Sequence, residues 1–251
     1  MNPKFLIASF TGCSGCIGIL LALDILPEFF ERVDVVYSPF LMDETEIQET
    51  DVALIEGCVS EDSQIETLKE IRKNAKKVIA LGTCAAFGGI LSLSTEKEAI
   101  PISEYIDIDG FIPGCPPPSK LLGNNVIKLL EDKAIVLSEI NMCANCPLRG
   151  EEELQYEEQI NKLQPEFTAE PRTQCFLKEK ILCLGPVVRD GCEHRCIESG
   201  IPCEGCMGPV SQDYTANIIN FLSMLKLPRN LRQYDGIFFR FAKPKIKRRK
   251  K

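Results

Sequence analysis

The chain has 251 residues, of which 45% are hydrophobic, and a formal net charge of −7 at pH 7. This acidic balance argues against a general nucleic-acid-binding protein, and no apolar run reaches the roughly 18 residues of a membrane-spanning helix. Thirteen cysteines beside a single histidine and no tryptophan leave little material for histidine-based catalysis or mixed Cys/His zinc sites, and favour metal bound by thiolates alone.

The first residues lead directly into a strand-like run, without the pattern of a secretory signal, so we expect a cytoplasmic protein without a membrane span. Disulfides are disfavoured in that compartment. Cysteines spaced as Cys-x-x-Cys pairs then indicate metal ligands.

An apolar run at residues 5–10 predicts the first strand, and a helix-like pattern covers residues 17–30. Between them lies Cys13-Ser-Gly-Cys16. A strand that ends in such a pair and opens a helix offers two thiolates near a helix N-terminus, which favours negative charge. This stretch is a candidate site for a metal cluster.

Continuous Val/Ile/Leu runs at residues 33–36, 52–55 and 77–81 predict further strands that are buried on both faces. A helix is predicted over residues 60–76, with Ser63 and Glu66 as its capping box. The alternation of strands and helices predicts an α/β domain over residues 1–140, a flavodoxin-like doubly wound parallel sheet.

Cysteines follow the predicted strand ends. Cys58 comes after residues 52–55, Cys84 after 77–81 and Cys115 after a short run at 108–112. Because ligands collect at the carboxyl ends of parallel strands, these thiols and the first pair should lie on one rim of the sheet. Four thiolates suffice for a 4Fe-4S cube. The alternative is that each cysteine is a small buried apolar residue.

After residue 140 the periodicity fades, and eight cysteines fall within residues 141–210. We expect a small loop-rich iron–sulfur domain there, because so few apolar residues cannot fold a segment unaided and bound clusters would stabilise it. A zinc-ribbon domain is the alternative. Residues 211–251 should form a helix, at 214–225, and a basic tail, which is either a solvated segment or an arm that docks an acidic partner or phosphate surface.

Three motifs identify a family. Cys13-Ser-Gly-Cys16, Gly82-Thr-Cys84-Ala and Pro113-Gly-Cys115-Pro-Pro, in that order, resemble the small, electron-transferring subunit of nickel–iron hydrogenases, and more distantly the cluster subunit of respiratory complex I. That distant relative has two adjacent cysteines at the first site. The later cysteine stretch resembles cytoplasmic members of the hydrogenase family, among them sulfhydrogenases and the subunits that serve heterodisulfide reductase or a deazaflavin coenzyme.

The resemblance implies three 4Fe-4S clusters. Their ligands would be, for the proximal cluster, Cys13, Cys16, Cys84 and Cys115; for the medial cluster, Cys192, Cys196, Cys203 and Cys206; and for the distal cluster, Cys143, Cys146, Cys175 and Cys183. Other family members have a histidine at the first distal position, where this chain has Cys143. The spacing of Cys192 and Cys196 would suit one turn of helix with both sulfurs on one side.

Two further residues are not assigned as ligands. Cys58 lies outside the three motifs and is interpreted as a spare thiol, and His194 as a neighbour of the ligands or a surface residue. Many relatives also place a glutamate two residues after the first Cys-x-x-Cys, where this chain has Gly18, so proton transfer is expected in the partner.

The function implied is an electron relay between a nickel–iron large subunit, which holds the hydrogen-splitting site, and a flavin-binding or heterodisulfide-reductase-type acceptor subunit. The alternative is a non-catalytic assembly or interaction protein that carries iron–sulfur clusters or zinc.

Overall fold

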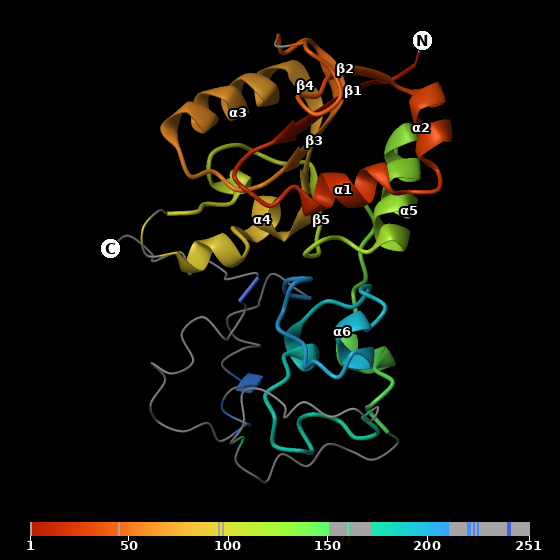
Figure 1. Cartoon of the computed structure of the whole chain (residues 1–251), viewed down its shortest axis with the longest axis vertical. Coiled ribbons are helices and arrows are strands. Elements are labelled where there is room, and N and C mark those ends of the chain that lie inside the picture. The colour runs from red at the N-terminus through yellow and green to blue at the C-terminus, as the bar shows by residue number, and fades with distance from the viewer. Residues whose placement is uncertain are drawn as a thin grey trace. The chain divides into compact units, whose positions relative to one another are not determined.

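The structure is a computed structural model that describes residues 2–44, 46–94, 96, 98–150, 160, 172–210, 220, 221, 223, 225, 240 and 241. The chain forms two compact units, Met1–Leu137 and Ser138–Lys251 (Figure 1). The predicted three-part division at residues 140 and 210 stays a prediction. The helix expected over 214–225 falls largely outside the described residues, and the basic tail falls wholly outside them.

The first unit is built on a parallel sheet with the strand order β2-β1-β3-β4-β5. The strands are β1 (Lys4–Ser9), β2 (Asp34–Tyr37), β3 (Thr50–Glu56), β4 (Ala75–Leu81) and β5 (Gly110–Ile112). This is the flavodoxin order, so the predicted doubly wound α/β fold is confirmed.

The sheet separates two apolar layers because successive side chains of a strand point to opposite faces. Phe5 and Ile7 of β1 join one buried layer, and Leu6 and Ala8 join the other. Helices α1 (Gly15–Leu21), α2 (Leu26–Arg32) and α5 (Ser119–Leu130) supply the first layer, and α3 (Asp62–Asn74) and α4 (Gly82–Phe87) supply the second (Figure 1). Of the predicted ligands, Cys16 belongs to the first of these two layers as the structure describes them, so the carboxyl ends of the strands are held mainly by apolar side chains.

The single helix predicted over residues 17–30 is wrong, since the structure has α1 and α2 in its place. The break falls at residues 22–25, and Pro27 lies in the first turn of α2. Proline suits the first turn of a helix but not a helix interior, where it removes a backbone hydrogen bond.

The predicted capping box of α3 is also wrong. The helix begins at Asp62, and its capping box pairs Glu61 with Gln64 instead of Ser63 with Glu66. Gln64 accepts hydrogen bonds from the backbone N–H groups of Ser60 (2.8 Å) and Glu61 (3.3 Å), which fixes the start of the helix at this point in the chain.

The described part of the second unit has little regular structure. It contains the short segments η3 (Met142–Asn145), η4 (Gly185–Val187) and α6 (Arg195–Glu198). The predicted turn of helix from Cys192 to Cys196 is wrong, because Glu193 and His194 have positive φ values of 57° and 54° and α6 begins only after them. None of the helices in the described part of the chain has the length and apolar character needed to cross a bilayer.

Candidate functional site

The loop that carries Cys13 is tied to the loop after β3. Thr11 and Cys58 form an isolated antiparallel bridge, with the N–H of each residue donating to the carbonyl of the other at 3.1 and 2.9 Å. The Thr11 hydroxyl also accepts a hydrogen bond from Gln64 at 2.9 Å. The first Cys-x-x-Cys pair is thereby placed by two neighbouring strands and by the start of α3.

The loops that carry Cys84 and Cys115 are tied to each other through Thr83. Its N–H donates to the Gly114 carbonyl at 3.0 Å, and its hydroxyl accepts from the Gly114 N–H at the same distance. Cys84 lies in α4, directly after β4, and Cys115 follows β5. Both cysteines therefore lie at the carboxyl ends of adjacent strands.

The structure brings the four predicted proximal cysteines together. Burial, followed by the charges of Glu56, Cys84, Cys115 and Cys13, raises the pKa of Cys16. Burial also raises the pKa of Cys84 to about 12, with Cys58, Cys115 and Cys13 adding to the effect. The thiols are thus near enough to repel one another as thiolates, and bound cations would relieve that repulsion.

Two glycines leave room for the sulfur atoms of two of these thiols. A Cβ atom on Gly82 would lie 2.2 Å from the Cys16 sulfur, and one on Gly89 would lie 2.5 Å from the Cys84 sulfur. Both glycines also have positive φ values, which an L side chain rarely adopts. The donor set formed by Cys13, Cys16, Cys84 and Cys115 consists of thiols alone, which fits an iron–sulfur cube.

Glu56, at the end of β3, is a buried acid at this site that the sequence analysis missed. Its Oε2 accepts a hydrogen bond from the Ile17 N–H at 2.9 Å, and its Oε1 accepts one from the Ser9 hydroxyl at 3.0 Å. The carboxylate thus holds the residue that follows Cys16. The signal in the sequence was a lone acid that directly continues an apolar strand and is followed by glycine.

Cys58 is also close to this group but already has a partner. Its side chain is fully buried, and its S–H donates to the Thr11 carbonyl at 3.3 Å. Burial raises the pKa of its thiol, as it does for Cys16 and Cys84, so the hydrogen bond to Thr11 is what sets Cys58 apart. The interpretation of Cys58 as a spare thiol stays a prediction.

In the second unit the four predicted distal cysteines are close neighbours. Burial raises the pKa of Cys143, and Cys183, Cys146 and Cys175 raise it further. A Cβ atom on Gly185 would lie 2.9 Å from the Cys143 sulfur and 3.7 Å from the Cys183 sulfur, so this glycine keeps space beside two of the thiols.

The four predicted medial cysteines also interact. The pKa of Cys203 is raised well above its usual value by burial and then by Cys183, Cys206 and Cys192. The pKa of Cys192 is raised mainly by burial, and the charge of Cys196 adds to the increase. The Cys203 N–H donates to the Cys183 sulfur at 3.3 Å, so the two sets of four meet at this contact.

All thirteen cysteines lie outside disulfides. Within the described residues, no three His, Cys, Asp or Glu side chains gather closely enough to hold a single metal ion. His194 is buried, contrary to the surface position that we considered, and lies beside the loops that carry both sets of the second unit.

Comparison with known proteins gives three relationships. Residues 13–129 match the family described as NADH ubiquinone oxidoreductase, 20 Kd subunit. The chain is 34% identical over 247 residues to a subunit of the F420-non-reducing hydrogenase vhu of Methanocaldococcus jannaschii, covering 84% of each protein. It is 28% identical over 219 residues to the delta subunit of sulfhydrogenase 2 of Pyrococcus furiosus, covering 79% of this chain and 83% of the relative.

Among solved structures, a chain of the NiFeSe hydrogenase of Desulfovibrio vulgaris Hildenborough superposes with a TM-score of 0.65 at 21% identity. The superposition covers 85% of this chain and 95% of that chain. It shows that the two chains share a fold.

Proposed function

We propose that this chain, which belongs to the family of nickel–iron hydrogenase small subunits, transfers electrons through three 4Fe-4S clusters. As a hydrogenase subunit it works in a complex with a large subunit. Electrons would pass between the nickel–iron site of that subunit and a flavin-binding or heterodisulfide-reductase-type acceptor subunit.

The observation that carries the proposal is the convergence of Cys13, Cys16, Cys84 and Cys115 at one rim of the sheet. These residues would hold the proximal cluster. Bound there, a 4Fe-4S cluster supplies a one-electron site whose potential depends on hydrogen bonds, charge and solvent exposure. The protein places the thiols, leaves room for the Cys16 and Cys84 sulfurs beside Gly82 and Gly89, and sets a buried carboxylate near them.

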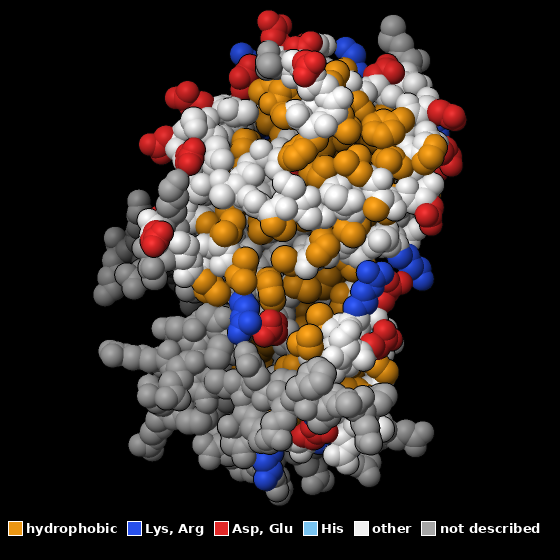
Figure 2. All heavy atoms as spheres, in the orientation of Figure 1, with side chains coloured by type: hydrophobic (Ala, Val, Ile, Leu, Met, Phe, Trp, Pro, Cys, Tyr) orange, Lys and Arg blue, Asp and Glu red, His pale blue; other side chains and the backbone are white. Residues whose placement is uncertain are grey.

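The rim around these thiols suits a large protein partner. Residues 11–23, 81–93 and 113–119 contain no Asp, Glu, Lys or Arg. Cys13, Cys115 and the side chain of Ile90 are exposed there. In the view of Figure 2, apolar side chains lie over the middle of the first unit, while charged ones lie along its upper and side margins. We assign the large subunit to the uncharged rim, where it would exclude water from the proximal cluster.

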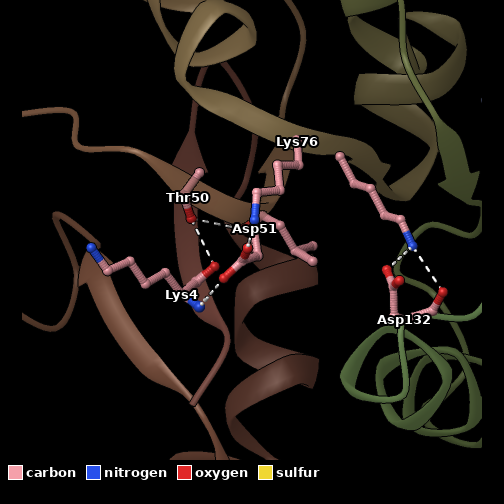
Figure 3. A network of polar contacts seen from close by, with 7 residues as sticks. Lys4, Thr50, Asp51, Lys76 and Asp132 are labelled. Atoms are coloured by element: carbon pink, nitrogen blue, oxygen red, sulfur yellow. Dashed lines mark hydrogen bonds and ion pairs between the residues drawn. The ribbon is translucent and has the colours of Figure 1, made fainter. Parts of the chain in front are cut away.

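The amino edge of the same sheet has the opposite character (Figure 3). Asp51 accepts from the Lys4 N–H at 2.8 Å and from the Lys76 ammonium at 2.7 Å, and Lys77 pairs with Asp132 at 2.5 Å. These residues surround an open hollow of about 790 Å³. Charged side chains paired within the chain have no need of a protein partner, which favours the rim over this edge as the site of docking.

The eight cysteines of the second unit would serve the other two clusters. We propose Cys192, Cys196, Cys203 and Cys206 for the medial cluster, and Cys143, Cys146, Cys175 and Cys183 for the distal one. The grouping of the thiols around Cys143 supports the distal set, while Cys203 is close to Cys183 as well as to Cys206 and Cys192. We also infer that the chain works in the cytoplasm, because thirteen cysteines outside disulfides suit a reducing compartment.

The proximal assignment is tested by Cys84→Ser in the complex with the large subunit, with Cys58 also replaced so that it cannot substitute. We expect hydrogen-dependent reduction of a dye to be lost while the other two clusters still form. Cys58→Ala alone is the matched control and should keep normal iron content and activity. Full dye reduction by the Cys84 variant would show that the assignment is wrong.

The medial assignment is tested by electron paramagnetic resonance of the mildly oxidised protein. A fourth thiolate retains the fourth iron, so the wild type should give no strong 3Fe-4S signal and Cys196→Ala should give one. A strong 3Fe-4S signal in the undamaged wild type would contradict a medial 4Fe-4S cluster.

A further inference from the structure

Asp190 is a buried carboxylate in the second unit, with 9% of its surface exposed. Its Oδ2 accepts a hydrogen bond from the Asn145 side-chain amide at 2.8 Å, and its Oδ1 accepts one from the Gly191 N–H at 2.7 Å. Asn145 precedes Cys146, and Gly191 precedes Cys192. One side chain is therefore bonded to two loops that carry cysteines of different sets.

His194 strengthens the same junction. Its Nε2 lies 2.9 Å from the Met142 carbonyl and 3.8 Å from Asp190 Oδ1. Because a carbonyl can only accept, Nε2 carries the proton of this hydrogen bond. The Met142 sulfur lies 3.8 Å from the Cys192 sulfur. Segment η3 is thus packed against the loop of residues 190–194 by both backbone and side-chain contacts.

The charge of Asp190 acts on both sets. Burial is the main cause that raises the pKa of Cys146 and of Cys192, and Asp190 adds to the increase at each thiol. Two neighbouring arginines are engaged elsewhere: Arg189 donates to the carbonyls of Ser138 and Val210, and Arg195 pairs with Glu193. The nearest basic side chain, His194, makes its hydrogen bond to the Met142 carbonyl. A charge in this buried position is screened much less than one at the surface.

We propose that Asp190 sets the reduction potentials of two clusters at once, as a fixed negative charge held between the loops of Cys146 and Cys192. The proposal rests on the proposed function, since it requires clusters at both sets. A nearby negative charge opposes the addition of an electron and lowers a reduction potential. Asp190 would therefore keep the medial and distal potentials low together. Glu56 holds the corresponding position beside the proximal set only.

The test is a redox titration of the complex followed by electron paramagnetic resonance of each cluster. Asp190→Asn removes the charge at nearly constant shape, so we expect the medial and distal potentials to rise while the proximal potential stays unchanged. Asp132→Asn, which removes a highly exposed acid of the first unit, is the matched control and should change none of them. Unchanged medial and distal potentials in Asp190→Asn would overturn the proposal.

Asn145→Ala provides a second test with the opposite sign. It removes the donor that stabilises Asp190 Oδ2 and leaves the negative charge less compensated, so both potentials should fall. If Asp190→Asn fails to assemble its clusters, Asn145→Ala decides alone, and the absence of a downward shift overturns the proposal. Wild-type protein that lacks clusters in the second unit would instead refute the proposed function.

Discussion

The two units of the chain hold their cysteines in different ways. In the first unit, Cys13, Cys16, Cys84 and Cys115 follow strands or begin helices whose apolar layers lie on both faces of a sheet. In the described part of the second unit, the regular segments η3, η4 and α6 span only three or four residues each, and Cys175, Cys183 and Cys203 are themselves among the buried side chains. We therefore expect the first unit to form its site before metal arrives, and the second unit to require the metal in order to fold.

The largest effect should come from removing the iron with a chelator. Structural metal sites contribute folding free energy directly, so residues 172–210 should lose the protection of their amides while β1, β3 and β4 keep theirs. Hydrogen exchange read by mass spectrometry measures both units in one sample. Equal loss of amide protection in the two units would contradict the expectation that only the second unit needs metal in order to fold.

A smaller effect should follow from removing one thiol in each unit. We expect Cys203→Ala to make the second unit sensitive to proteolysis, because it removes a thiol that is buried among the thiols of Cys183, Cys206 and Cys192. Cys16→Ala should lose about four irons, one cube, with the sheet intact. If the second unit of Cys203→Ala stays resistant to proteolysis, the fold of this unit does not depend on the cluster that Cys203 would bind.

A single methyl group at Gly82 would collide with one of the proximal thiols, Cys16. Gly82→Ala should lose about four irons, because the added Cβ would lie 2.2 Å from the Cys16 sulfur at a φ of +80°. The left-handed conformation alone costs an alanine about 1–2 kcal/mol. Gly18→Ala is the matched control in α1, where an added Cβ meets nothing within 4 Å. The control should keep all its iron. A full iron content in Gly82→Ala would show that the site does not depend on the room that Gly82 leaves for the Cys16 sulfur.

The amino edge of the sheet should show the smallest effect. The hydrogen bond from Lys76, followed by that from the Lys4 N–H, lowers the pKa of Asp51. A lowered pKa stabilises the fold above the ordinary aspartate pKa of about 3.9, and this contribution is lost as the pH falls through the lowered value. Asp51→Asn should therefore slightly reduce the urea midpoint at pH 7 but not below that pKa, with iron content unchanged. A loss of iron would show that this edge also supports the clusters.

The sequence predicted the first unit well because regular elements leave periodic patterns. Runs of apolar residues located the strands that precede Cys58 and Cys84, and parallel topology then placed the cysteines on one rim. The break between α1 and α2 was missed because Ala22, Leu23, Ile25 and Leu26 continue the apolar pattern around the single acid Asp24. Asp190 was missed because a single acid in a loop leaves no pattern. Glu56 does continue an apolar strand, but only the fold shows that its side chain is buried.

In the second unit, the grouping of the cysteines came from the resemblance to a family and not from periodicity. Loops without a repeating pattern give no geometric expectation of which thiols meet. The positive φ values of Glu193 and His194 illustrate this, since spacing alone indicated a continuous helical turn there. The contact between Cys183 and Cys203 likewise depends on a fold that local sequence does not specify.

The most direct test of the central claim is the analysis of iron, acid-labile sulfide and zinc in anaerobically purified protein. We expect about twelve irons per chain with matching sulfide, as three cubes require. Zinc at two sites with little iron would contradict an electron relay and favour a zinc-bearing assembly or interaction protein.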